Sequence, residues 1–342
     1  MRKYRGLHKM RTKLIILGFI FSGLILSCSS SKKYISTISL EEQRKLDIFD
    51  NLQKSIVKIT ASSYYKNHYY DYPQNDEESQ YLGKLLVNSN LTTNSVAGTG
   101  LIVYQDYSKQ YILTCQHVFD FQDTIRTYYL DNKQEETNYL KSLSSKVGEQ
   151  ILVFHKNGQS TVAKVIAEDV KNDIALIETE LDDFQFMEKK FEGMYGDSDM
   201  MQFGQEVYLI GFPKGFFMIT RGLVSPTQFK NKYLIDAPFN RGFSGGIVIR
   251  LTTEKPYHEF MGMANSISYS SEYVLSPVED LRVVEKHKFI PYDNNIYTKE
   301  LKSLNYGITY IVKSRLIIDF LKKYAKGLSI QDFEIQEQVQ TY

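Results

Sequence analysis

The amino-acid sequence predicts an all-β fold, a barrel or a sandwich, with one short helix before the strands and one after them. Short segments rich in β-branched and aromatic residues recur between residues 55 and 264, and turn signals such as Asn157-Gly158 separate them. Apolar residues at helical spacing are confined to two segments near the ends of the chain. The composition, with 42% hydrophobic and 24% charged residues, is that of a folded chain. These features together indicate a globular β protein.

The N-terminus has the pattern of an export signal. Six Lys and Arg residues and no acidic residue precede Leu14, and a mostly apolar run from Leu14 to Leu26 is too short to cross a bilayer comfortably. The run ends in Ser27-Cys28, which resembles a bacterial lipobox. The resemblance implies that residues 1–27 are a signal peptide, that Cys28 carries lipid, and that residues 28–39 form a polar tether. An uncleaved membrane anchor is the alternative, and both interpretations predict an exported protein held in the bacterial cell envelope.

The charge balance and the two cysteines narrow the range of functions. The chain has 41 Lys and Arg against 40 Asp and Glu, and six of the basic residues precede Leu14, so the remainder is mildly acidic. An acidic body has no electrostatic basis for binding nucleic acid. With Cys28 lipidated, Cys115 has no partner for an intramolecular disulfide, so the core alone must hold the fold. The sequence shows no His, Cys and Asp residues at metal-ligand spacing, and we expect neither a metal nor a cofactor.

The elements of one domain follow in order along residues 40–326. Ser39 and Glu42 have capping-box spacing and predict a helix over residues 40–53. Strands are predicted after it over residues 55–60, 100–104, 111–114, 124–130, 151–155, 161–166, 174–178, 206–210, 222–225, 233–236, 247–250 and 260–264.

Two polar stretches and the C-terminal end complete the expected organisation. Residues 61–95, which are rich in tyrosine, and residues 271–304 are predicted as long surface loops. Apolar residues at helical spacing predict a helix over residues 314–324. The polar residues 327–342 are expected to form a loose tail.

Three segments contain the residue types of a nucleophilic triad. They are Ala97-Gly98-Thr99-Gly100 with Thr114-Cys115-Gln116-His117-Val118, then Asn172-Asp173-Ile174-Ala175, and finally Asp236-Ala237-Pro238-Phe239-Asn240-Arg241-Gly242-Phe243-Ser244-Gly245-Gly246. Each segment alone has an ordinary explanation, since a lone His is usually structural and Asn-Asp is usually a turn signal. In the order His, Asp, Ser they resemble the trypsin-like peptidase domain, especially that of the bacterial HtrA (Deg) proteins. The resemblance runs from about residue 53 to residue 324 and implies two antiparallel β-barrels with a cleft between them.

The same resemblance implies a serine endopeptidase that acts through an acyl-enzyme on Ser244. A serine hydroxyl needs a base within hydrogen-bond reach, and His117 would take its proton and pass it to the leaving amine. Asp173 would hold the other ring nitrogen of the histidine. The backbone N–H groups of Gly242 and Ser244 would bind the developing oxyanion. The expected partner is a protein or peptide substrate, which could pair with a strand edge over residues 260–266.

Three features qualify the resemblance. Phe243 stands where a small polar residue is common, so the packing of the oxyanion loop can differ. No PDZ-sized segment follows Tyr324, so the regulatory PDZ domains of HtrA proteins are not expected. Cys115 lies two residues before the base and is predicted to be a buried packing residue. Two alternatives to a peptidase are a catalytically silent protein of this fold that binds peptides, and an esterase of this fold.

Overall fold

The computed structural model describes residues 39–71, 86–131, 136–181, 188–277 and 296–327. Side chains are described in these ranges except at residues 86–87, 266–274, 276–277, 296–306 and 325–327. Cys28, the expected signal peptide and most of the expected tail lie outside the described residues. Internal contacts divide the chain into Met1–Asp47 and Ile48–Tyr342, and the barrels and the site described below lie in the second unit.

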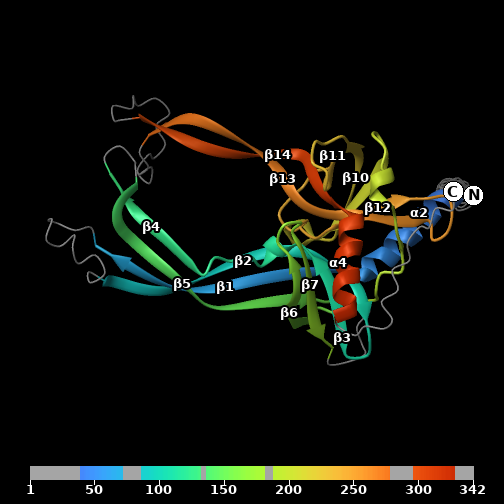
Figure 1. Cartoon of the computed structure of the whole chain (residues 1–342), viewed down its shortest axis with the longest axis horizontal. Helices are drawn as coiled ribbons and strands as arrows, with labels where there is room; N and C mark the ends of the chain where they lie inside the picture. The colour runs from blue at the N-terminus through green and yellow to red at the C-terminus, as the bar shows by residue number, and fades with distance from the viewer. Residues whose placement is uncertain (1–38, 72–85, 132–135, 182–187, 278–295, 328–342) are drawn as a thin grey trace, which may run out of the picture. The chain divides into compact units, whose positions relative to one another are not determined.

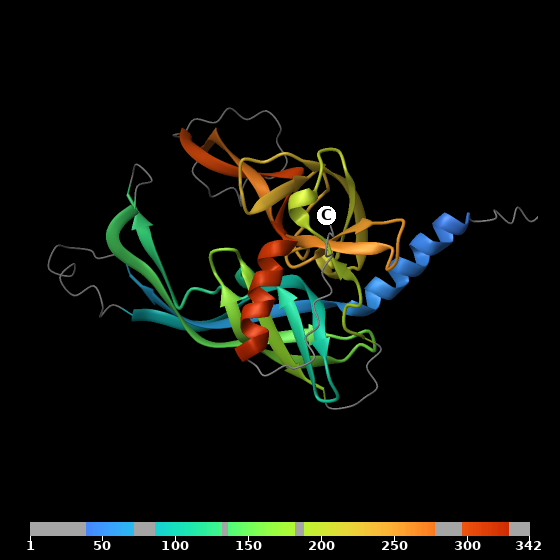
Figure 2. The same ribbon diagram turned by 45° about the vertical axis from the view of Figure 1, so that its right-hand side comes forward.

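The first half of the second unit is a closed β-barrel with one additional strand (Figures 1 and 2). The hydrogen-bonded order is β1-β2-β3-β7-β6-β5, and pairing of β5 with β1 closes the ring, while β4 extends it beside β5. All of these pairs are antiparallel. The strands are β1 (Ile56–Tyr70), β2 (Leu86–Gln105), β3 (Lys109–Thr114), β4 (Thr124–Leu130), β5 (Glu136–Phe154), β6 (Ser160–Asp169) and β7 (Ile174–Glu180).

The second half is a barrel of the same kind. Its order is β12-β9-β10-β11-β14-β13, closed by pairing of β13 with β12, and the short strand β8 pairs with β13 in parallel. The strands are β8 (Met194–Tyr195), β9 (Glu206–Gly211), β10 (Met218–Ser225), β11 (Lys232–Ile235), β12 (Ile247–Leu251), β13 (His258–Pro277) and β14 (Ile296–Lys313). The predicted all-β double barrel is therefore confirmed.

Both predicted helices are present. They are α2 (Leu40–Leu52) and α4 (Ser314–Gly327). The described residues also form the 3-10 turns η1 (Gln53–Ser55), η2 (Gln116–Val118), η3 (Ser198–Met200) and η4 (Pro213–Gly215). The Glu42 N–H donates to Ser39 Oγ at 3.1 Å, as the capping-box spacing predicts. Of the apolar positions of α2, Ile48 and Leu52 are buried, whereas Leu40 and Leu46 are exposed, so only the C-terminal half packs on a core.

Helix α4 connects the two barrels. Its first residue, Ser314, donates through Oγ to Gly196 O at 2.6 Å, and its buried face includes Ile317 and Leu321. Near its end, Tyr324 Oη donates to the carbonyl of Glu168 in β6 at 3.4 Å. Figure 1 shows the helix (red) running from the strands of the second barrel to those of the first. Within the described ranges, no helix is both long enough and apolar enough to cross a membrane.

The prediction of two surface loops is wrong for most of the described residues in these stretches, because the chain there continues as long strands. Residues 61–70 belong to β1 and residues 88–95 to β2, and the two strands pair in register from Ile56–Leu101 to Asn67–Asn90 and beyond. Residues 271–277 and 296–304 likewise belong to the β13–β14 ladder. The burial of β1 alternates along this stretch, and its polar side chains find partners, since Asn67 Nδ2 donates to Asn90 Oδ1 at 2.8 Å. Paired polar residues therefore extend a barrel strand in place of a loop.

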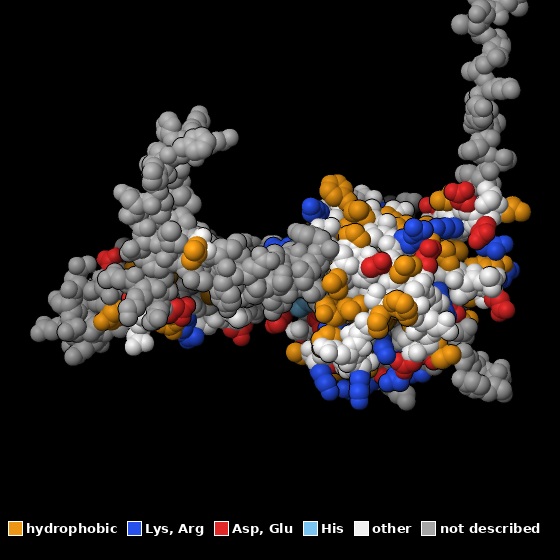
Figure 3. Space-filling view, turned by 90° about the horizontal axis from the view of Figure 1, so that it is seen from above, with side chains coloured by type: hydrophobic (Ala, Val, Ile, Leu, Met, Phe, Trp, Pro, Cys, Tyr) orange, Lys and Arg blue, Asp and Glu red, His pale blue; other side chains and the backbone are white. Residues whose placement is uncertain are grey.

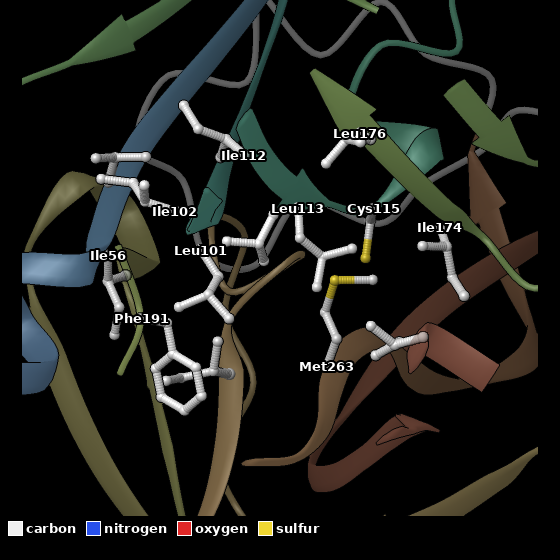
Figure 4. Packing of buried hydrophobic residues seen from close by; sticks show 14 of the residues in the cluster. Ile56, Leu101, Ile102, Ile112, Leu113, Cys115, Ile174, Leu176, Phe191 and Met263 are labelled. Carbon is white, nitrogen blue, oxygen red and sulfur yellow. The ribbon is translucent and has the colours of Figure 1, made fainter. Parts of the chain in front are cut away.

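The interior is formed by the aliphatic strand residues that the sequence pattern predicts. Ile112 and Leu113 of β3 and Leu101 of β2 are fully buried (Figure 4). Cys115 is also fully buried, and Figure 4 shows its sulfur facing that of Met263 from the second barrel. The thiol donates to the carbonyl of Ala264 at 3.3 Å. Cys115 is thus a packing residue at the junction of the barrels, as predicted.

Candidate active site

His117 lies in η2, shortly after β3, and one carboxylate holds both its backbone and its ring. Its backbone N–H donates to Asp173 Oδ1 at 2.8 Å, and its Nδ1 lies 2.6 Å from Asp173 Oδ2. The carboxylate only accepts, so the proton on this side of the ring belongs to Nδ1. The remaining nitrogen, Nε2, is then an acceptor in the neutral ring, and it lies 2.8 Å from Ser244 Oγ.

Asp173 reaches this position from the turn between β6 and β7. Its backbone is left-handed, with φ of 58°, a conformation that Asp tolerates better than most residues. The preceding Asn172 closes the turn, because its N–H donates to Asp169 Oδ1 at 3.1 Å and its Nδ2 donates to Asp169 Oδ2 at 2.7 Å. The Asn-Asp pair therefore forms a turn, and that turn directs the Asp173 side chain toward His117.

Ser244 precedes β12 and is 7% exposed. Glycines surround it because other residues would not fit. A Cβ on Gly242, where φ is +104°, would lie 2.3 Å from the carbonyl oxygen of Phe212. A Cβ on Gly245, where φ is +83°, would lie 2.0 Å from the carbonyl oxygen of Thr99. The loop around the serine thus passes against two other backbone segments, and only glycine permits that approach.

The backbone of this loop is oriented by the hydrogen bonds of its carbonyl groups. The carbonyl of Arg241 accepts from the Lys214 N–H at 2.8 Å. In a trans peptide the N–H points away from the carbonyl, so the Gly242 N–H is directed to the opposite side. Among the described residues, neither the Gly242 N–H nor the Ser244 N–H is donated to another protein group. The two groups predicted to bind an oxyanion are therefore available for a ligand.

Thr99 holds the same loop from the first barrel, a contact that the sequence reasoning did not assign. The side chain is fully buried, and its Oγ1 donates to Gly242 O at 2.6 Å and accepts from Phe212 N–H at 2.9 Å. Its backbone N–H donates to Ser244 O at 2.7 Å. The only signal in the sequence is its place between two glycines before a strand, which does not reveal partners in the other barrel.

Asn265 is a second residue that the sequence reasoning missed. It is 3% exposed, and its Nδ2 donates to Asp173 Oδ2, the oxygen that also faces His117 Nδ1. The predicted strand ended one residue earlier, at Ala264. A register shift between Ala264 and Ser266 in the β13–β14 pair marks a bulge at this residue.

Cys115, His117 and Asp173 together form a group that could hold a metal ion, with donor atoms within 4.8 Å of one another. The sequence spacing did not suggest this group. Its chemistry fits a metal poorly, because burial and the neighbouring Asp173 carboxylate raise the pKa of the Cys115 thiol well above its usual value, and a thiol must lose its proton to bind a metal. His117 Nδ1 and Asp173 Oδ2 are also already joined to each other by a hydrogen bond. The arrangement fits proton transfer better than metal binding.

Phe243 does not project from the oxyanion loop toward solvent. Its side chain is 1% exposed and packs in the core of the second barrel, where its ring lies 6.0 Å from that of Phe239. The unusual residue before Ser244 thus fills the interior and leaves the space next to the serine hydroxyl open to His117.

Parts of the chain are similar to known proteins. Residues 98–255 match the family model of the trypsin-like peptidase domain. A probable periplasmic serine endoprotease DegP-like of Marinomonas sp. (strain MWYL1) is 30% identical over 168 residues, which are 47% of this chain and 28% of that protein. A serine protease HtrA-like of Staphylococcus aureus (strain USA300) is 28% identical over 195 residues, 51% of this chain and 24% of that protein. A solved HtrA-type protease with decapeptide has a TM-score of 0.44 at 16% identity, over 82% of this chain and 66% of that one.

The matched region contains all three residues of the hydrogen-bonded series, His117, Asp173 and Ser244. The chain spans less than a third of the length of the two curated relatives named above. Residues 98–255 thus resemble the trypsin-like peptidase domain, and the chain is similar to the HtrA-like serine proteases over about half of its length.

Proposed function

We propose that this protein is a serine endopeptidase whose nucleophile is Ser244. The observation that carries the proposal is the unbroken series from Asp173 Oδ2 to His117 Nδ1 at 2.6 Å and from His117 Nε2 to Ser244 Oγ at 2.8 Å. The series joins three residues that are distant in sequence, and it lies beside two backbone N–H groups that donate to no other described residue.

In the proposed reaction His117 is the general base. Nε2 takes the proton of Ser244 Oγ while the oxygen attacks the carbonyl carbon of the scissile peptide bond. The imidazolium that forms is stabilised by Asp173, and it then gives the proton to the leaving amine. Water then attacks the carbonyl carbon of the acyl-enzyme, with His117 again as the base, and Ser244 is released. No step requires a cofactor.

The oxyanion of each tetrahedral intermediate would accept from the N–H groups of Gly242 and Ser244. The peptide groups that carry these donors are fixed before substrate binds, because the Arg241 carbonyl accepts from the Lys214 N–H and the Phe243 carbonyl accepts from the Gly246 N–H. Fixed donors cost no reorganisation at the moment when charge develops.

The proposed substrate is a peptide in an extended conformation. From His258 to Met263, strand β13 pairs with β12, so that side of the predicted edge at residues 260–266 is covered. The last backbone bonds on this side join Ala264 to Gly245 and Gly246. From Ser266 onward, the described backbone of β13 pairs with β14, and a peptide could add along its other side as a further strand.

Nucleic acid is not the proposed partner. In the view of Figure 3, basic and acidic side chains are interspersed over the described surface of the barrels. A nucleic-acid site would need Lys and Arg gathered along one groove or face. The surface in this view therefore gives no support to a nucleic-acid partner, in line with the mildly acidic composition.

The test of the proposed function is covalent labelling of Ser244 together with peptide hydrolysis. We expect a fluorophosphonate probe to label the parent protein and not Ser244→Ala, and a peptide library to be cleaved by the parent alone. Ser198→Ala is the matched control, since Ser198 is also buried and lies away from His117, and this variant should be labelled as the parent is.

Two outcomes would change the assignment. Peptide binding without labelling of the parent would identify a catalytically silent binding protein. The Phe243 side chain gives that alternative no support, because its ring is buried in the second barrel. Labelling with hydrolysis of esters but not of peptides would identify an esterase.

We further infer that the protein is exported and attached to a membrane through lipid on Cys28. The lipobox-like Ser27-Cys28 supports this proposal, and the Marinomonas relative is named as periplasmic. In cells given labelled palmitate, the parent protein should incorporate the label and Cys28→Ala should not. Equal incorporation by both would contradict lipidation at this cysteine.

A further inference from the structure

Asp173 receives a second support from the other barrel, through two side chains. Lys232, the first residue of β11, donates from Nζ to Asn265 Oδ1 at 2.7 Å. Asn265, on β13, donates from Nδ2 to Asp173 Oδ2. The side chains therefore form one line from Lys232 through Asn265 to Asp173, His117 and Ser244.

The chemistry of the groups fixes the orientation of the Asn265 amide. An ammonium group only donates and a carboxylate only accepts, so the carbonyl of the amide must face Lys232 and its NH₂ must face Asp173. Reversing the amide would place two acceptors against each other at Asp173 and two donors at Lys232. Because Asn265 is 3% exposed, water cannot readily replace either bond.

A second contact links the segment before β11 to the turn that carries Asp173. Asn231, immediately before Lys232, donates from Nδ2 to Asn172 Oδ1 at 3.1 Å. Asn172 is the residue before Asp173. The segment that leads into β11 thus contacts both the backbone turn that carries Asp173 and, through Asn265, the carboxylate itself.

We propose that Lys232 and Asn265 are positioning residues that hold the Asp173 carboxylate in the orientation that His117 requires. Asp173 uses Oδ1 for the His117 N–H and Oδ2 for His117 Nδ1, so a rotation of the carboxylate would break both contacts. The Asn265 N–H group at Oδ2 opposes that rotation, and Lys232 keeps the amide from turning over. Neither Lys232 nor Asn265 needs to contact the scissile peptide bond. This assignment rests on the proposed peptidase function.

The test compares substitutions that change the line of side chains with little change in volume. Asn265→Asp replaces the donor at Asp173 by an acceptor and is expected to lower kcat between about tenfold and a hundredfold, as loss of a hydrogen bond to a charged group implies. Lys232→Met removes the ammonium and is expected to lower kcat about threefold to tenfold with KM unchanged, because its effect passes through the neutral amide. Lys232→Arg should retain most of the parental kcat.

The matched control is Lys230→Met, an exposed lysine two residues away in the same segment, which should behave as the parent. Fluorophosphonate labelling of the parent separates the two proposals, since an unlabelled parent contradicts the peptidase function itself. If the parent is labelled and both Asn265→Asp and Lys232→Met react at its rate, the positioning role is overturned. It is also overturned if the loss in Lys232→Met appears in KM, accompanies a lower Tm, or is not recovered by Lys232→Arg.

Discussion

Asp173→Asn is expected to lower kcat by about 10⁴-fold, as the loss of the correct histidine tautomer does in a Ser-His-Asp triad. The surroundings of the side chain explain why. The His117 backbone N–H requires an acceptor at the Oδ1 position, so the carbonyl of the new amide takes that place and its NH₂ faces Nδ1. Nδ1 must then be the acceptor, Nε2 carries the proton, and the ring can no longer take the proton of Ser244.

The measurement is kcat on a peptide that the parent cleaves, together with Tm. We expect Tm to fall modestly, because the amide has the shape of the carboxylate and keeps the bond to the His117 N–H, but its NH₂ also faces the NH₂ of Asn265. Asp123→Asn is a suitable control, since this aspartate is 87% exposed and pairs with Lys146 instead of the histidine. A fall of less than tenfold in the Asp173 variant would show that another group orients His117.

Gly242→Ala is expected to lower kcat by about 10²–10³-fold, the range that loss of one oxyanion donor gives. The added methyl group would lie 2.3 Å from Phe212 O, a backbone atom that cannot move aside as a side chain can. The loop must therefore shift. Its N–H groups leave the positions fixed by the Lys214 and Thr99 contacts, and KM for a short substrate should change less than kcat.

Gly204→Ala separates this steric effect from the strain of the backbone. Gly204 also has a positive φ, +79°, but a Cβ there would meet nothing within 4 Å. Its substitution should cost about 1 kcal/mol of stability, from the left-handed conformation alone, and leave kcat unchanged. Urea denaturation and hydrolysis of the two variants side by side check this. If Gly242→Ala keeps the parental kcat, the loop does not supply the oxyanion donors.

The members of the hydrogen-bonded series could be predicted from the sequence because each stands in a short local pattern. His117 follows an apolar strand, Asp173 follows an asparagine at a turn, and Ser244 lies among glycines that its loop requires. Asn265 has no such pattern, since it lies on a strand and a bulge directs it toward Asp173. Thr99 stands between two glycines in the sequence, but its hydrogen-bond partners lie 113 and 143 residues away along the chain. Contacts of that separation depend on how the barrels meet.

The long strands were missed for a different reason. Residues 61–70 contain four tyrosines and few aliphatic residues. This polar composition is typical of a loop, although aromatic residues favour strands. In the structure β1 pairs with β2 on one side and with β5 on the other along this stretch. Partners on both sides satisfy the backbone, so the strand does not need an apolar face throughout.

The contacts of Thr99 have a consequence for how reactivity arises. Ser244 and its loop belong to the second barrel, but Thr99, His117 and Asp173 come from the first, and each bonds to residues across the junction. A second barrel that has folded by itself would hold a serine without a base and a loop without its support. The nucleophile would therefore appear only when the two barrels dock, and the rate of probe labelling during refolding would follow that docking step.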